Sequence, residues 1–544
     1  MTDALDRLRL VPRVLRQAWG RLTVLTILAF WIAWPLAGFL GQATGGAGGF
    51  SLGAFERVFG EGRPFLVLKN TVAVALSASL MALAAGGLAG GLLARARVPW
   101  PRVWLAGLAA GAALPPYLVG VAWQAVSAPG APLEGALAVE GTWGAARVLA
   151  SWLAPVVALV AVATFSAADA DAEEAALLAR GPWGALGAVT LPLAAPGLAS
   201  AWALAFVLAA VNYSVADLAC VHVYPVEIFT RFSAYHDVAA AAVATLPLAG
   251  LLAAAWVLAR LARPRGAPSG LRLGSALGRR LQARTPGWVD ALALAVLALL
   301  VGWNPGLPLA AFVWKAGGPA RYADALGAAG EDMVFSGGTA VLTAAVVTVS
   351  ALAVVAARLR HRRGLLGELC GWLAYLSFFV PPCVLGIALV EQWSGWSWAE
   401  PLYGTALGLA VGLAARVLPV GVKVLETVFE RLDPELEEAA WACGVSPVRS
   451  LYGILLPLLV PAMGAVAVLG ALLSLGEVDL AVLLTPPGQA PVMVRIFNFL
   501  HYGMDETLAA CCALMVLAVG AGALGLVAVS SVVVRRLSTQ GTTP

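Results

Sequence analysis

The sequence predicts an all-α membrane protein with about twelve transmembrane helices, arranged as two parallel six-helix repeats. Hydrophobic residues make up 61% of the 544 positions and charged residues 12%, whereas charged residues are roughly a quarter of a soluble domain. Apolar runs of about 20 residues, the length that crosses the hydrocarbon core as a helix, recur about a dozen times. A polar segment that begins at Glu173 also returns 265 residues later, at Glu438. These observations together indicate a duplicated membrane protein.

The composition also argues against two kinds of site. The six cysteines lie mostly inside apolar segments, without the paired spacing of a metal site, so we expect them to be small buried residues. The basic residues occupy short loops between apolar segments rather than one face of a folded domain, which argues against nucleic-acid binding. We therefore expect no metal site and no nucleic-acid partner.

The first repeat is expected to cover residues 1–262. Five arginines precede an apolar run from Leu22 to about Gly41, which is too long for a cleaved signal peptide and predicts a first span with a cytoplasmic N-terminus. The loop 95–102 is strongly basic, whereas the loop 124–145 has two glutamates and no arginine, so the two are assigned to opposite sides. Further spans are expected at 71–94, 103–123, 146–166, 193–213 and 238–260.

The second repeat, 288–544, follows a linker at 263–287 that is rich in Arg, Gly, Pro and Ser. Its basic loop at 358–364 and the Arg535-Arg536 pair after the last span place the corresponding sides inward. Because an even number of spans returns each half to the same orientation, both termini and the linker are expected in the cytoplasm. The expected spans are 288–306, 337–357, 366–390, 401–424, 458–484 and 508–534.

The duplicated polar segments fall on the cytoplasmic side, within the loops 167–192 and 425–457. In the second loop Asp433 can cap a short helix, Gly444 ends it, and Pro447 begins another. In an ungapped alignment Ala179 stands where Gly444 does, and the nearest glycine of the first loop is Gly181. Each loop is predicted to form a compact surface unit against which another protein can close. The ungapped matches are Glu173 with Glu438, Ala175 with Ala440, Pro182 with Pro447, Pro192 with Pro457 and Pro196 with Pro461.

The second loop resembles the cytoplasmic Glu-Ala-Ala (EAA) loop of permease subunits of ATP-binding-cassette (ABC) importers, whose pattern is Glu-Ala-Ala, a glycine, then Leu-Pro. The first loop fits at Glu173, Ala175 and Pro192 and departs at Glu174 and Ala179. LPPYLVGVAW at 114–123 and GEVDLAVLLTPPG at 476–488 are similar to the ferric-iron and thiamine type of binding-protein-dependent permease. The resemblance implies a type I ABC importer permease fold, in which each loop forms a coupling helix in a groove of the ATPase. The coupling residues it implies are Glu173, Glu174, Ala175, Ala179, Gly181, Glu438, Ala439, Ala440 and Gly444.

The partners follow from the same resemblance. No G-x-x-x-x-G-K-[ST] phosphate loop occurs, and no lysine follows a glycine. We therefore expect a transport subunit rather than an enzyme, with no cofactor of its own and with ATP and Mg²⁺ on a separate ATPase. The resemblance implies two copies of that ATPase, a periplasmic or lipid-anchored substrate-binding protein, membrane lipid around the spans, and location in the inner membrane of a bacterium.

Two groups of residues are candidates for the translocation path. Pro-Pro pairs interrupt the third and ninth spans at matched positions and should kink them, although packing alone could account for such kinks. Polar side chains end the fifth and eleventh spans, where ionisable groups either face a cavity or lie in the interface and face solvent. An acidic outer vestibule would suit a cationic cargo, and ferric iron is the expected solute. Thiamine, a polyamine or a phosphonate remain alternatives, because path residues do not identify the substrate. The candidates are Pro115, Pro116, Asn212, Asp217, Pro381, Pro382, Glu477 and Asp479.

Two other classes of function remain as alternatives. A secondary transporter of the major-facilitator kind also has twelve helices in two parallel repeats. Such a transporter needs a buried carboxylate relay, whereas the mid-span regions of this chain are nearly free of charge. A purely structural membrane scaffold would need no matched kinks. The twin cytoplasmic loops therefore favour the ABC permease.

Overall fold

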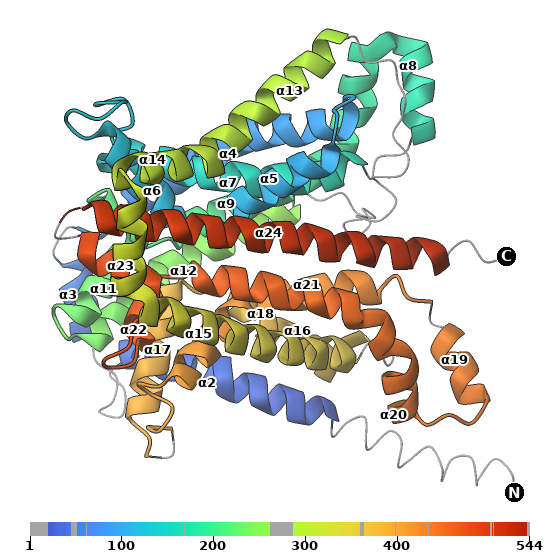
Figure 1. Cartoon of the computed structure of the whole chain (residues 1–544). Coiled ribbons are helices and arrows are strands. Elements are labelled where there is room, and N and C mark those ends of the chain that lie inside the picture. Colours follow the sequence, from blue (N-terminus) through green and yellow to red (C-terminus); the bar gives the residue numbers. More distant parts are fainter. Residues whose placement is uncertain are drawn as a thin grey trace, which may run out of the picture.

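The computed structural model describes residues 20–44, 52–60, 63–166, 170–261, 287–359, 364–397, 399–433, 435–500, 503 and 505–540. Apart from Gly287, the predicted linker lies outside the described residues. Every element of the described chain is helical, which confirms the all-α class. The long helices run side by side, with short helices and loops at the left end of Figure 1 and the two predicted cytoplasmic loops at the right end.

The first half contains two helices for its first span, a broken third span, and short helices after its fifth span. Its elements are η1 (Ala29–Ala33), α2 (Trp34–Gly41), η2 (Gln42–Thr44), α3 (Gly53–Phe59), α4 (Pro64–Arg95), α5 (Pro101–Ala113), α6 (Pro116–Ser127), α7 (Gly141–Ser166), α8 (Ala170–Ala185), η4 (Leu186–Thr190), α9 (Leu191–Ala210), α10 (Ser214–Leu218), α11 (Tyr224–Ser233) and α12 (Val238–Leu261).

The second half repeats this order with two main differences: one long helix, α15, replaces α3 and α4, and two short helices, α19 and α20, stand in place of α8. Its elements are α13 (Gly287–Val301), η5 (Gly302–Gly306), α14 (Leu307–Ala316), α15 (Pro319–Leu359), α16 (Leu365–Leu376), α17 (Pro382–Ser394), α18 (Ala406–Phe429), α19 (Glu435–Ala442), α20 (Pro447–Ser450), η6 (Leu451–Leu455), α21 (Leu456–Leu475), α22 (Ala481–Leu484), α23 (Val492–Leu500) and α24 (Glu506–Gln540).

Ten helices among the described residues are long and apolar enough to cross a membrane. The expected spans 103–123 and 366–390 are each broken at the Pro-Pro pair that the sequence analysis expected to kink them. In the first of them, α5 and α6 are bent by 91° at the break before Pro116. The second divides into α16 and α17 at Pro381. Because a proline has no N–H and keeps the preceding residue out of the helical region, two prolines in a row end one helix and start another.

The outer ends of the two halves are held by matching contacts. The N–H of Tyr224, at the start of α11, donates to Oγ1 of Thr71 at 3.0 Å. In the second half, the N–H of Val492, at the start of α23, donates to Oγ of Ser336 at 2.8 Å. The recurrence of this cap in two distant segments supports the division into two repeats.

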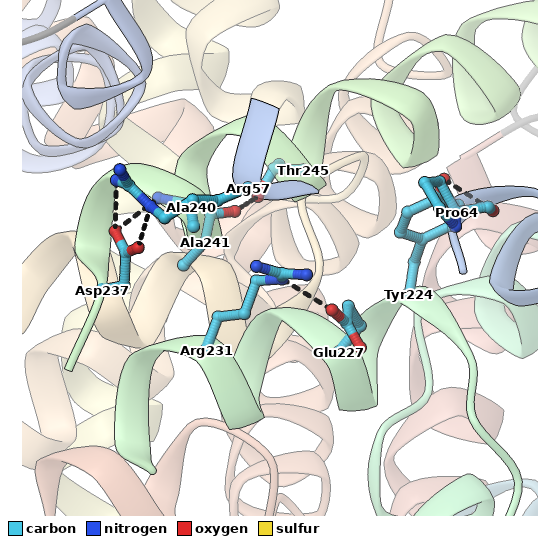
Figure 2. A network of polar contacts seen from close by, with 9 residues as sticks. All are labelled: Arg57, Pro64, Tyr224, Glu227, Arg231, Asp237, Ala240, Ala241 and Thr245. Carbon is cyan, nitrogen blue, oxygen red and sulfur yellow. Dashed lines mark hydrogen bonds and ion pairs between the residues drawn. The ribbon is translucent and has the colours of Figure 1, made fainter. Parts of the chain in front are cut away.

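Polar contacts surround the short helix α11: one ion pair joins α3 to the residue before α12, a second lies within α11, and a hydrogen bond joins α11 to the start of α4 (Figure 2). Nε of Arg57 donates to Asp237 at 2.8 Å, and Nε of Arg231 donates to Glu227 at 2.6 Å. The hydroxyl of Tyr224 donates to a backbone carbonyl at the start of α4 at 3.3 Å. Burial by itself would raise the pKa of the Asp237 carboxyl, but the N–H of residue 240 and the Arg57 guanidinium outweigh it and hold that pKa below its usual value.

The first span of each half packs against the other half. The ring of Trp34, in α2, lies 5.1 Å from the ring of Trp396, just after α17. In the reverse sense, the ring of Trp303, in η5, lies 5.7 Å from that of Trp123, in α6. The two halves are therefore interlocked through exchanged helices rather than simply placed side by side.

Candidate functional site

Each of the two loops predicted to be cytoplasmic turns sharply at one glycine. Gly181 interrupts α8 with φ 69°, and Gly444 follows α19 with φ 80°. Positive φ in this range is nearly free for glycine and unfavourable for residues with a Cβ atom. Gly181 is thus the equivalent of Gly444, and Ala179, which the ungapped alignment placed there, is not.

The same comparison corrects the pairing of the glutamates. Residues 173–176 and 437–440 both read Glu-Glu-Ala-Ala, and Glu173 and Glu437 are buried, with 3% and 8% of the residue exposed. Glu174 and Glu438 are both exposed. The buried Glu173 therefore corresponds to Glu437 rather than to Glu438. The ungapped alignment was one residue out of register, because the two loops differ in length between the glutamate and the glycine.

Glu173 fastens the first loop to the end of α4. Its carboxylate accepts a hydrogen bond from Nη2 of Arg95 at 2.6 Å and forms a second bond with Nη1 of the same guanidinium. The hydroxyl of Thr190 donates to it at 2.8 Å. A paired arginine and glutamate that share further hydrogen bonds make a rigid connection, so α8 and the end of α4 should move together.

The second loop is attached differently. Glu437 accepts a hydrogen bond from Oγ of Ser450 at 3.1 Å, which closes α19 onto α20. Arg358, in the last turn of α15, pairs with Glu426 of α18 and with Glu368 of α16, 3.3 Å away. The arginine of the second half therefore holds two spans together, while that of the first half holds the loop.

A π-helical turn joins each loop to the next span. η4 ends at Thr190, directly before Leu191-Pro192, and η6 ends at Leu455, directly before Leu456-Pro457. The proline ring clashes with the carbonyl four residues earlier in an α-helix, and a wider turn relieves that clash. The Leu-Pro pair of the motif thus accounts for a local loosening at the same place in both halves.

The outer faces of the loops carry exposed apolar side chains. Leu178 and Trp183 of α8 are 90% and 73% exposed, and Tyr452 of η6 is 65% exposed. Exposed aliphatic and aromatic groups gathered on a small element are typical of a protein-binding surface. Among the predicted coupling residues, Glu174, Ala175, Ala179, Glu438, Ala439 and Gly444 are exposed, Gly181 and Ala440 are half-buried, and Glu173 is buried.

Two of the predicted path residues, Pro115 and Asp479, lie where the two halves join. The carboxylate of Asp479 accepts hydrogen bonds from the backbone N–H groups of Tyr213 at 2.9 Å and Ser214 at 3.2 Å, across the halves. A Cβ atom built on Gly476 would lie 2.7 Å from Cγ of Pro115, so the backbones approach closely there. We call this junction, formed by Pro115, Tyr213, Ser214, Gly476 and Asp479, the seam.

Other polar candidates cap the short helices next to the seam. Oδ1 of Asn212 accepts the N–H of Val215 at 2.9 Å, and Oε1 of Glu477 accepts the N–H of Leu480 at 3.4 Å. Asp217 is half-buried in α10. Asn212 and Glu477 thus play the same local role in the two halves, since the side chain three residues before an amide can cap it.

The sequence analysis missed Arg416, which lies near the middle of α18. Its Nη1 donates to the carbonyl oxygens of Ser377 at 3.1 Å, Phe378 at 3.4 Å and Val380 at 3.4 Å. These carbonyls precede Pro381, where the break leaves backbone acceptors without helical donors. The available signal was an arginine within an otherwise apolar span, which by itself marks a functional candidate.

Comparison with known proteins agrees with this arrangement. Residues 350–539 match the family described as the binding-protein-dependent transport system inner membrane component. A sulfate transport system permease protein CysT of Salmonella typhimurium is 34% identical over 114 residues, which are 19% of this chain and 40% of that protein. A probable sulfate transport system permease protein of Chlorokybus atmophyticus is 32% identical over 110 residues, 19% of this chain and 38% of that protein.

A molybdenum transport system permease protein ModB of Haemophilus influenzae is 32% identical over 140 residues, 23% of this chain and 59% of that protein. The chain thus spans between 38% and 59% of the length of these three relatives. The family match contains the second cytoplasmic loop, the seam residues Gly476 and Asp479, and Arg416. The matched segment, residues 350–539, is therefore similar to the inner membrane components of binding-protein-dependent transport systems.

Proposed function

We propose that the chain is the membrane-spanning permease subunit of an ATP-driven importer and moves a small solute delivered by a binding protein. The observation that most supports this proposal is the pair of loops at one end of the molecule. Each loop turns at a glycine and has exposed apolar side chains. Two such surfaces suit two copies of an ATPase subunit, which would hold ATP and Mg²⁺.

The orientation follows from the loops. If they face the cytoplasm of a bacterium, the ends of the chain near Gly20 and Gln540 face it as well, because both lie at the same end as α8 and α19 (Figure 1). The seam and the helices α11 and α23 would then face the periplasm. A periplasmic or lipid-anchored binding protein would deliver the solute to that face.

We propose a tetrahedral oxyanion of the sulfate or molybdate kind as the solute. The three relatives described above are named for sulfate or molybdenum transport and not for iron transport. The acidic groups that suggested a cation are largely occupied, because Asp479 and Glu477 accept hydrogen bonds from backbone N–H groups. These observations favour an oxyanion over ferric iron.

The transport cycle would alternate between two arrangements of the halves. Closure of the ATPase would draw the loops together, and the rigid link from Glu173 to Arg95 would pass that movement to α4. The seam would part at the outer end and accept the solute. Release of the nucleotide products would restore the seam and leave the inner side accessible.

The experiment is ATP-dependent uptake of radiolabelled sulfate and molybdate into proteoliposomes that contain the chain, its ATPase and its binding protein. We expect uptake that disappears when the phosphate-loop lysine of the ATPase is substituted. Uptake by the purified chain alone, without any ATPase, would contradict the proposal.

A further inference from the structure

Arg416 is a charged side chain among buried apolar neighbours. Ala414, Ala415, Val417 and Leu418 are at most 5% exposed, whereas Arg416 itself is partly accessible. A guanidinium at the depth of a membrane span is unfavourable unless it pairs or faces an aqueous space. Its accessibility indicates that it reaches such a space between the spans.

The guanidinium is held firmly on one side only. Nη1 makes all three hydrogen bonds to the carbonyls before Pro381. Within the described part of the chain, Nε and Nη2 of Arg416 have no hydrogen-bond partner and no carboxylate within ion-pair distance. Neither atom is enclosed without a partner, so both keep some accessible surface.

Two acids lie near Arg416, namely Glu477 and Asp479. Both oxygens of Asp479 accept N–H groups of the first half, and one oxygen of Glu477 caps α22. The negative charges of these two acids would weaken the binding of an anion at Arg416 but would not abolish it. A weak site is what a translocation path requires, because the solute must also leave.

The first half provides an internal comparison. Gly144 and Gly408 make the same close approach to a preceding carbonyl, and Pro155 and Pro419 lie inside α7 and α18. By this alignment, the position that matches Arg416 is Trp152. The helix break at the Pro-Pro pair of the first half therefore forms without a charged side chain at this position. Hydrogen bonding to the backbone carbonyls at the break is thus not a sufficient reason for Arg416.

We propose that Arg416 is a binding residue of the translocation path, and that its Nε and Nη2 donate to two oxygens of a tetrahedral oxyanion. This inference rests on the proposed function and assigns its substrate contact. The planar fork of an arginine matches the edge formed by two such oxygens, whereas a lysine offers one point of charge. The remaining donor, Nη1, keeps the fork in place during passage.

The test compares Arg416→Lys and Arg416→Gln in the complete complex in proteoliposomes, with sulfate and molybdate as probes. Lysine can still donate to the three carbonyls but cannot form the fork, so it separates binding from backbone support. We expect both variants to lower uptake roughly tenfold to a hundredfold, the usual effect of losing a charge-assisted pair of hydrogen bonds. Glu477→Gln should raise uptake about twofold to tenfold at low salt, because it removes a nearby negative charge.

The matched control is Lys423→Gln, which removes a positive charge from the same helix at a side chain that is 47% exposed. It should leave uptake within about twofold. Wild-type uptake by Arg416→Lys, with the same unfolding temperature as the parent, would overturn the assignment while leaving the importer intact. Failure of the wild-type complex to move either oxyanion would instead overturn the proposed substrate.

Discussion

At the scale of single residues, the two glutamates of each loop have different tasks. Glu173 is buried against Arg95 and Thr190, and Glu437 is buried against Ser450. Glu174 and Glu438 point away from these contacts and are exposed. The inner glutamate therefore maintains the loop, and we propose that the outer one meets the partner.

This division predicts opposite outcomes for neighbouring substitutions. Glu173→Ala leaves a partly enclosed Arg95 without its counter-charge and should lower the free energy of unfolding by about 3 kcal/mol. Glu438→Ala should leave stability unchanged and lower ATP-driven uptake. Unfolding in detergent micelles and uptake by the reconstituted complex would measure the two effects. Equal loss of stability in both variants would contradict the division.

A second prediction concerns Asp479 in the seam. Asp479→Ala would leave the N–H groups of Tyr213 and Ser214 without acceptors, at a cost of about 1–3 kcal/mol for each. The outer ends of the halves should then separate more often. Cys383 is a natural reporter, because it is fully buried and its Sγ lies 3.8 Å from the carbonyl oxygen of Pro225 in the other half.

In a Cys220→Ser background, which removes the exposed thiol of the first half, Cys383 should react faster with an external thiol reagent when Asp479 is substituted. Ser233→Ala, which removes a hydroxyl bonded only within α11, is the matched control and should not change that rate. An unchanged rate in the Asp479 variant would show that the seam does not depend on this carboxylate.

Hydropathy predicted most spans and the all-α class correctly. The contacts of Asp479 could not be predicted, because its partners lie about 265 positions away and no local pattern connects them. Arg416 was overlooked because one charge hardly changes the hydropathy of a span, and its role depends on the carbonyls of Ser377, Phe378 and Val380. Ungapped matching also could not detect the length difference that shifts Glu173 onto Glu437.

At the scale of elements, the breaks between helices determine where the chain changes direction and where it can move. The bend of 91° between α5 and α6 turns the third span toward Gly476 of the seam. The π-helical turns η4 and η6 lie between the loops and the spans that follow them. A turn of this kind is less regular than an α-helix and can change its hydrogen bonding at small cost. Movement of a loop would therefore be taken up first at these turns.

The glycine turns give a prediction at this scale. Gly181→Ala should lower the free energy of unfolding by about 1 kcal/mol, although no atom lies within 4 Å of the added Cβ. The penalty comes from the backbone conformation alone. Gly338→Ala is the matched control, because Gly338 lies inside α15 in open space with ordinary helical φ, and it should stabilise by about 0.5–1 kcal/mol. Equal effects, measured by unfolding in micelles, would contradict the assigned turn.

At the scale of the whole molecule, the two halves are similar in plan and unequal in detail. The first loop is tied to α4 by Arg95, whereas Arg358 ties spans of the second half to each other. We expect a complex with two ATPase subunits, one on each loop, in which the first contact transmits movement more rigidly. Native mass spectrometry of the assembled complex would give the number of ATPase subunits. A single bound subunit would contradict the symmetric use of the loops.

The exchange of first spans also affects how the protein is made. The helix ending at Gly41 packs against α12 of its own half and, on another side, against α17 at residues 382–394. During synthesis, one side of this first hydrophobic segment therefore faces lipid until most of the polypeptide has emerged from the ribosome. A prematurely terminated product would keep that side bare, which would mark it for membrane proteolysis and leave only full-length chains to assemble.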